Sequence, residues 1–389
     1  MKLVPDYRYW NAIFFAFFCA YLLPLGSGPV NAVFYAGILL PAFLFSLRQD
    51  YLDLLASRHF LIVVTLCMYA LVRATSPDIA LDVAKFLVIF LALSLAALSL
   101  PLATVEATRR TALFFLIALI AYILANTIHQ GVTQHWLPGQ RLAPMFGNLK
   151  SVIFCADLVI SALVVYSWTC LTMRDYRPLL IANAVVIVFV LGLLQSRSVL
   201  PVWLGSMSAL LIFSVPAAER RRFLLYLGIF ITTAAIVFIN IPELLARGDS
   251  YRFEIWSGYL SSTLSCSAFI GCGWGVELPF TTADGSKIAH PHSMYVQHLF
   301  WGGIVGLTLL LLALVPPIFA GIRRAHYAAW ALLPGCIALA FDGKSLIAQP
   351  NERWFLVTVP LAILIATLTN KNGDIAPIPA NAATDKQLS

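Results

Sequence analysis

The amino-acid sequence predicts an all-α integral membrane protein. Hydrophobic residues make up 60% of the 389 residues and charged residues only 11%. Ordinary soluble domains carry about 25% charged residues. Apolar runs of about 20 residues recur along the chain, and a run of that length spans a bilayer as a helix. Lipid is therefore the expected solvent for most of the chain.

The apolar runs predict about twelve transmembrane helices. The first run comes after Lys2 and Arg8 and has no small-residue cleavage site behind it, so we interpret it as a retained first span. Most connections are short, as in a compact helical bundle. The spans are expected at 9–25, 29–47, 59–75, 79–102, 111–128, 150–170, 178–195, 198–217, 223–241, 294–321, 327–346 and 354–369.

These spans predict one polytopic membrane domain over residues 1–369. Residues 370–389 are rich in Asn, Ala, Pro and Asp and predict a disordered tail. The longest loop, about 242–291, lies between the ninth and tenth spans and holds tryptophans, tyrosines and leucines, so we expect it to be folded. Within this loop, segment 251–264 is expected to be helical, and the glycines of 271–275 should form a turn after that helix.

Basic residues predict the orientation, because short cytoplasmic loops carry an excess of Lys and Arg. A majority of the 25 lysines and arginines fall on one side when the N-terminus is placed in the cytoplasm. Both termini are then cytoplasmic, and the loop 242–291 lies on the opposite side. The formal net charge of +7 is spread over short loops, which argues against nucleic acid as a partner and favours membrane lipids.

Two of the seven cysteines differ from the rest, because Cys266 and Cys272 lie in the long loop. An oxidising compartment would permit a disulfide there, but the sequence leaves open whether they pair. The sequence contains no CxxC pair, HExxH motif or clustered carboxylates, so no metal or other cofactor is expected. The other cysteines fall in apolar spans and should behave as small hydrophobes: Cys19, Cys67, Cys155, Cys170 and Cys336.

The preference of basic residues for the cytoplasmic side does not account for three arginines on the predicted extracytoplasmic side: Arg141, Arg197 and Arg252. A charge near the hydrocarbon is costly and tends to face a cavity or a partner. A guanidinium presents a planar fork of donors that suits phosphate oxygens. Simpler interpretations are a solvated loop charge for Arg141, a side chain that reaches the interface for Arg197, and an ion pair with Glu254 for Arg252. Together the three arginines suggest a polyanionic ligand.

His292 precedes a predicted helix and is a candidate general base, since the unperturbed pKa of histidine, about 6.5, lies near working pH. The alternative is a capping or hydrogen-bonding role. His290 competes for the same role two residues away, and sequence spacing does not separate the two histidines.

These residues resemble the signature of the O-antigen ligase family. His292 and Ser293 are followed, after nine residues, by Gly303 and Gly306. This arrangement matches the family's pattern of His, then Asn, Ser or Gln, then nine residues, then Gly-x-x-Gly.

Other segments resemble the family's remaining motifs in the same order, over about 141–307. Leu149 and Lys150 depart from the family, where many relatives have Pro-Asn, and Val199 replaces a small residue. These departures bear on which donor glycan is held and leave the arginines and His292 in place. The resembling segments are 141–151, 196–205, 252–260 and 271–275.

The resemblance implies a GT-C-type glycosyltransferase architecture with a large periplasmic loop in the bacterial inner membrane. It implies metal-independent, inverting transfer of a glycan from undecaprenyl pyrophosphate to the lipid A-core oligosaccharide during lipopolysaccharide assembly. Arg197 and Arg252, together with Arg141, would bind the pyrophosphate. His292 would accept the proton of the acceptor hydroxyl or orient the acceptor. The donor repeat unit, the acceptor sugar and the oligomeric state stay open.

Rival functions are an O-antigen polymerase and a protein O-glycosyltransferase of the same superfamily. A transporter of lipid-linked glycans belongs to a different class. Transporters often show repeated halves and charges near the bilayer midplane. In this sequence the salient charges gather on one side and no repeat is evident, which favours an enzyme.

Overall fold

The computed structural model describes residues 7–44, 49–100, 104–133, 142, 146–239, 251–281, 287–288, 290–348, 351 and 353–369. Helices dominate these residues. The elements are α1 (Tyr7–Leu22), α2 (Ser27–Phe34), η1 (Tyr35–Leu39), α3 (Leu40–Leu44), α4 (Gln49–Ala56), α5 (Arg58–Val72), α6 (Pro77–Leu98), α7 (Val105–Thr133), α8 (Val152–Thr172), α9 (Tyr176–Phe189), η2 (Val190–Leu194), α10 (Val199–Phe213), η3 (Ala217–Glu219), α11 (Arg220–Ile239), α13 (Arg252–Cys266), β1 (Phe280–Thr281), β2 (Lys287–Ile288), α14 (Met294–Arg323), α15 (Tyr327–Phe341), η4 (Trp354–Thr358) and α16 (Val359–Thr369).

Each predicted span overlaps one or more of these helices, and the chain is an all-α, multi-pass membrane protein. The count of about twelve spans and the GT-C-type architecture stay predictions. Within the described residues, six helical segments are long and apolar enough to cross a bilayer: Ser27–Leu44, Pro77–Leu98, Val105–Thr133, Val152–Thr172, Tyr176–Leu194 and Met294–Arg323. Shorter apolar helices are Arg58–Val72, Val199–Phe213, Phe223–Thr232, Tyr327–Phe341 and Trp354–Thr369.

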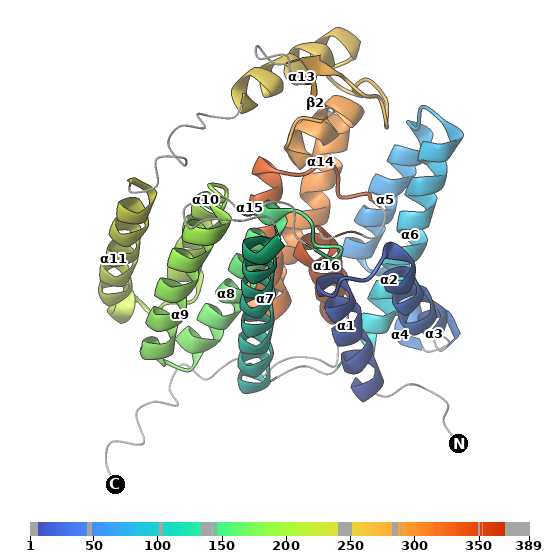
Figure 1. The fold of residues 1–389 in the computed structure, drawn as a ribbon. Coiled ribbons are helices and arrows are strands. Elements are labelled where there is room, and N and C mark those ends of the chain that lie inside the picture. Colours follow the sequence, from blue (N-terminus) through green and yellow to red (C-terminus); the bar gives the residue numbers. More distant parts are fainter. Residues whose placement is uncertain are drawn as a thin grey trace.

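Helix α8 occupies the centre of the bundle. Its apolar stretch is 89% buried, as expected of a helix that is apolar all round and enclosed by other helices. It packs against α7, α9, α10 and α15, while α14 packs against α5, α13 and α15. Helix α11 lies at one flank, and α2 to α4 lie at the other (Figure 1). Side chains of α8 therefore reach the centre of the molecule.

Helix α13 lies across one end of the bundle, above α14 (Figure 1). We call this end of the bundle the α13 end. The predicted helix at 251–264 is thereby confirmed. The ring of Tyr259 packs edge-on against Phe300 of α14, with 4.9 Å between the centroids. A disulfide joins Cys266 to Cys272 and closes the turn after α13, which settles the pairing that the sequence left open.

The turn after α13 packs its backbone directly against a kink in α14. At Gly303 the helix has φ of 61°, a left-handed conformation that favours glycine. A Cβ at Gly303 would collide with the backbone of Phe269, and one at Gly271 would collide with Gly303. The turn also satisfies backbone groups that the kink frees: the amide of Cys272 donates to the Phe300 carbonyl at 2.8 Å. Gly303, the first glycine of the signature, is therefore needed for the close approach of the two backbones.

Helix α15 ends at Phe341, earlier than the predicted span 327–346. Asp342 and Lys344 therefore lie in the connection to η4, where their side chains reach the α13 end. Hydropathy did not show this end point, because apolar residues come after the two charges. The predicted disordered tail, 370–389, lies outside the described residues.

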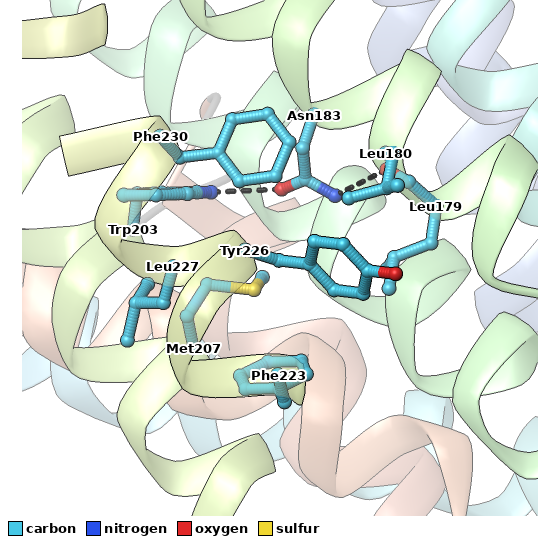
Figure 2. Close-up of a pocket in the computed structure, with 9 residues that line it drawn as sticks. All are labelled: Leu179, Leu180, Asn183, Trp203, Met207, Phe223, Tyr226, Leu227 and Phe230. Atoms are coloured by element: carbon cyan, nitrogen blue, oxygen red, sulfur yellow. Dashed lines mark hydrogen bonds between the residues drawn. The ribbon is translucent and has the colours of Figure 1, made fainter. Parts of the chain in front are cut away.

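An apolar pocket lies between α9, α10 and α11 (Figure 2). Its polar groups bond one another: Trp203 Nε1 donates to Asn183 Oδ1 at 2.9 Å, and Asn183 Nδ2 donates to the carbonyl of Leu179 at 2.9 Å. Among the described side chains, those that line it carry no charge; the remaining lining residues are Leu180, Met207, Phe223, Tyr226, Leu227 and Phe230. Chemistry on an anionic substrate therefore has to be sought elsewhere.

Candidate active site

His292 sits on a constrained segment directly before α14. Its φ is 53°, an uncommon conformation for a non-glycine residue that often marks a functional site. The next residue, Ser293, caps α14 by accepting a hydrogen bond from the amide of Val296. The preceding residue is also fixed, because Trp256 of α13 donates through Nε1 to the Pro291 carbonyl at 2.8 Å. Helices α13 and α14 thus hold the imidazole in place.

The imidazole of His292 contacts a carboxylate that is 50 residues away in the chain. Its Nδ1 lies 3.1 Å from Oδ1 of Asp342. The His292 side chain is 36% exposed, whereas that of Asp342 is only 11% exposed. A carboxylate beside Nδ1 stabilises the tautomer with the proton on Nδ1, which leaves Nε2 as a proton acceptor.

His290 has a different environment from His292. Its Nδ1 accepts a hydrogen bond from the His292 amide at 3.2 Å, and the two ring centroids are 4.3 Å apart. Burial, with a smaller contribution from the neighbouring His292, lowers the pKa of His290 to about 4. The His290 ring is therefore neutral at pH 7 and holds the backbone of His292.

A second carboxylate, Asp157, lies in the middle of this region. It is fully buried in α8, and neither of its oxygens has a hydrogen-bond partner among the described residues. Asp157 interacts electrostatically with Asp342 and Arg252, and the Ser198 hydroxyl is its polar neighbour. Two acidic side chains from separate helical segments thus converge on the end of the bundle that holds His292.

Arg197 lies in a break between two helices. The π-helix η2 ends at Gln195, whose φ of 47° turns the chain, and α10 begins at Val199. The hydroxyls of Ser196 and Ser198 on either side of Arg197 are buried and lie 2.9 Å apart. The neighbouring Ser198 hydroxyl is a polar group close to Asp157, so this break lies beside the central helix α8.

Arg252 begins α13, after Tyr251 in a left-handed conformation with φ of 59°. The predicted structural pair with Glu254 does not form: the ion pairs within the described ranges do not include one between these two side chains. Instead, Arg252 interacts electrostatically with Asp157. The third predicted arginine, Arg141, lies outside the described residues.

The connection between α15 and η4 adds two cations to this region. Lys344 and Arg353 both interact electrostatically with His290. Lys344 Nζ lies 3.5 Å from Glu277 and 5.9 Å from the ring centroid of Trp301. These cations follow α15 in the chain, whereas Arg197 precedes α10 and Arg252 begins α13.

The sequence analysis missed Asp157 and Asp342 as site residues. A signal was present, because an acidic side chain inside an apolar span is costly and usually has a partner. The sequence analysis applied this argument only to basic residues and histidines. Among the described residues, no group of three or more His, Cys, Asp and Glu side chains is arranged to hold a metal ion. Metal independence stays a prediction.

The fold and the site define a multi-pass helical membrane protein with histidine, arginine and carboxylate side chains gathered at one end of the bundle. Over 199 residues the chain is 30% identical to the O-antigen ligase of Pseudomonas aeruginosa. The alignment covers 49% of each chain, so this chain spans about half the length of that relative. The predicted resemblance to the O-antigen ligase family is confirmed, and the match supports assignment to that family. No protein-family model matches the chain.

Proposed function

We propose that this protein is an O-antigen ligase. It transfers a glycan from undecaprenyl pyrophosphate to the lipid A-core oligosaccharide, at the periplasmic face of the bacterial inner membrane. The observation that carries the proposal is the contact of 3.1 Å between Nδ1 of the accessible His292 and Oδ1 of the buried Asp342. The similarity to an O-antigen ligase supports the choice of substrates.

In the proposed reaction, a hydroxyl oxygen of the acceptor sugar attacks the anomeric carbon of the donor. The bond between that carbon and the pyrophosphate oxygen breaks, and undecaprenyl pyrophosphate leaves with the electron pair. The hydroxyl proton moves to Nε2 of His292, and Asp342 stabilises the imidazolium that forms. Direct displacement inverts the anomeric configuration.

The growing negative charge on the pyrophosphate is stabilised by arginine side chains. Arg197 and Arg252 are the described candidates, and Arg141 is the third from the sequence. Fixed donors aimed at a developing charge contribute more in a water-poor site than in bulk solvent. One guanidinium group can also donate two hydrogen bonds to the oxygens of a phosphate. Arginines can therefore supply the charge neutralisation that a divalent metal supplies in other enzymes.

The orientation in this proposal rests on the positive-inside rule. Both termini lie in the cytoplasm, and the α13 end faces the periplasm. The disulfide between Cys266 and Cys272 supports this orientation, because disulfides persist in the periplasm and are rare in the cytosol. The lipid tails of donor and acceptor would enter between the helices from the bilayer.

The test is transfer by the purified protein, with undecaprenyl-pyrophosphate-linked glycan as donor, lipid A-core as acceptor and EDTA present. Wild type should place glycan on lipid A-core, and His292→Ala should not. His59→Ala is the control, since this histidine lies at the start of α5, whereas the far end of that helix contacts the turn after α13 through Arg73 and Gly271. If the donor glycan lengthens while lipid A-core stays bare, the protein is a polymerase. Donor binding without any transfer would indicate a transporter.

A further inference from the structure

Helix α13 has an exposed apolar side. Phe253 and Leu264 are 71% and 64% exposed, and Leu260 between them is 49% exposed. Their spacing of seven and four residues places the three side chains on one side of the helix. We call these three residues the α13 stripe. Exposed apolar patches mark surfaces that contact a partner or a membrane, so the stripe is a candidate contact surface.

The other two sides of α13 face the bundle and water. The buried side consists of Ile255, Tyr259 and Thr263, and Tyr259 packs there against α14. The remaining side is exposed and polar, with Glu254 and Ser261. A helix with separate apolar and polar exposed sides is typical of the boundary between lipid headgroups and acyl chains. The division of α13 therefore favours a position in the membrane interface.

Helix α14 has an exposed apolar side of its own beyond the kink at Gly303. Residues 304–323 form a helical segment about 30 Å long, which matches the thickness of the bilayer hydrocarbon, about 30 Å. The start of this segment therefore lies where the hydrocarbon ends on the side of α13, and its exposed apolar residues face lipid. These residues are Ile304, Leu311, Leu312, Val315 and Phe319.

The turn after α13 connects the two apolar surfaces at this level. The amide of Ile304 donates to the Ala268 carbonyl at 2.9 Å, and the amide of Val305 donates to the Phe269 carbonyl at 3.1 Å. The Phe269 side chain is 70% exposed, and Leu264 lies in the last turn of α13, just before it. Helix α13 lies across this end of the bundle (Figure 1). The lipid-facing surface of α14 thus continues through Phe269 onto the α13 stripe.

We propose that the α13 stripe is a membrane-docking surface. It rests on the acyl chains of the bilayer lipids around the bundle, in the leaflet at the α13 end, while Glu254 and Ser261 stay in water. Continuity with α14 identifies the occupant, because the same lipids already cover α14 at Ile304. Aromatic side chains such as Phe253 and Phe269 suit this boundary.

This docking also fixes the depth of the candidate base. Trp256 of α13 donates to the Pro291 carbonyl at 2.8 Å, directly before His292. A change in the level of α13 would therefore move the imidazole relative to the bilayer. This consequence rests on the proposed function: it places His292 near the headgroups, where the pyrophosphate of a lipid-linked donor lies.

The test measures lipid contact directly, with the full chain at one copy per nanodisc of phosphatidylethanolamine and phosphatidylglycerol. A fluorescent amino acid replaces Leu264, and the quencher is a phospholipid with a nitroxide on its acyl chain near the glycerol. The same probe at Leu312 reports a lipid-facing position, and at Ser261 it reports the polar side of α13. Leu264 should be quenched at least half as strongly as Leu312. Quenching no stronger than at Ser261 would overturn the proposal.

Other occupants of the stripe give different results in the same assay. Quenching at Leu264 that disappears when two chains share a nanodisc would assign the stripe to a second copy. Quenching that added undecaprenyl pyrophosphate abolishes would assign it to the donor lipid. Either result would overturn the proposal.

A second measurement uses wild type, in case the labelled chains do not fold. A phospholipid with a photoreactive diazirine on its acyl chain should leave adducts on residues 260–269 as well as on residues 304–319. Adducts on α14 without adducts on α13 would overturn the proposal.

Transfer assays separate this proposal from the ligase assignment. Leu260→Ser with Leu264→Ser should lower transfer several-fold, chiefly through a higher KM for the lipid-linked donor. Ser261→Ala, a change on the polar side of the same helix, should leave transfer unchanged. If Leu264 is quenched by lipid but wild type transfers no glycan, the docking stands and the ligase assignment fails. If wild type transfers glycan but Leu264 is not quenched, only the docking fails.

Discussion

Two regions of the bundle bury polar side chains in opposite ways. Between α9, α10 and α11, the polar atoms of Asn183 and Trp203 bond each other within an apolar pocket (Figure 2). At the α13 end, Asp157 is buried without a hydrogen-bond partner among the described residues, and Asp342 contacts an accessible histidine. Satisfied polar groups stabilise a membrane bundle, whereas unsatisfied ones persist where function requires them. We therefore expect the pocket to serve packing, and the α13 end is the proposed site of chemistry.

The largest expected effect comes from replacement of His292. His292→Ala should lower the transfer rate about 10²- to 10⁴-fold, the usual range for loss of a general base. Asp342→Asn should lower kcat less, because the imidazole remains but loses its partner at Nδ1. The measurement is transfer per folded molecule, with folding checked by thermal unfolding. A His292→Ala rate within twofold of wild type would remove the base assignment.

Loss of Arg252 should be the next largest effect. Arg252→Ala should lower transfer about 10²-fold or more, as expected for removal of a donor aimed at developing charge. Arg252→Lys should recover only part of the rate, because an ammonium lacks the planar fork of donors. Arg197→Ala should behave in the same way. Full ligation by Arg252→Ala would contradict a pyrophosphate clamp and weaken the contrast between the two regions.

The disulfide should matter for stability more than for chemistry. Cys266→Ser with Cys272→Ser opens a loop with a sequence separation of 6 residues, so the loss of stability should be about 2 kcal/mol. Transfer per folded molecule should stay near wild type, since the turn is also held by backbone hydrogen bonds to α14. Thermal unfolding and transfer assays on the same preparation check both parts. A collapse of transfer in fully folded protein would show that the turn shapes the site.

The smallest effect is expected at the α9–α10–α11 pocket. Asn183→Leu removes its hydrogen bonds to Trp203 and Ser167 and should cost about 1 kcal/mol, as for hydrogen bonds between membrane helices. The rate of transfer per folded molecule should not change. A strong loss of transfer at wild-type stability would show that the pocket takes part in function.

Much of the site could be predicted from sequence, because its basic residues and histidine occur in short local patterns. Arg197 lies between two spans, Arg252 opens a loop helix, and His292 precedes a glycine signature. The choice between His290 and His292 could not be made locally, since it depends on Asp342, 50 residues further along the chain. Asp157 was hidden because hydropathy averages over a window, and one carboxylate in about 20 apolar residues hardly changes the average.

By itself, the sequence determined that the chain is an all-α membrane protein with a folded loop around 251–264 and a resemblance to O-antigen ligases. These properties arise from apolar runs and short motifs, whose residues are close together in the chain. Only the tertiary structure decided that Asp157 and Asp342 converge on His292 and Arg252, and that Gly303 admits the backbone of the turn after α13. Such contacts join residues far apart in the chain, and they depend on how the helices pack rather than on what each segment prefers alone.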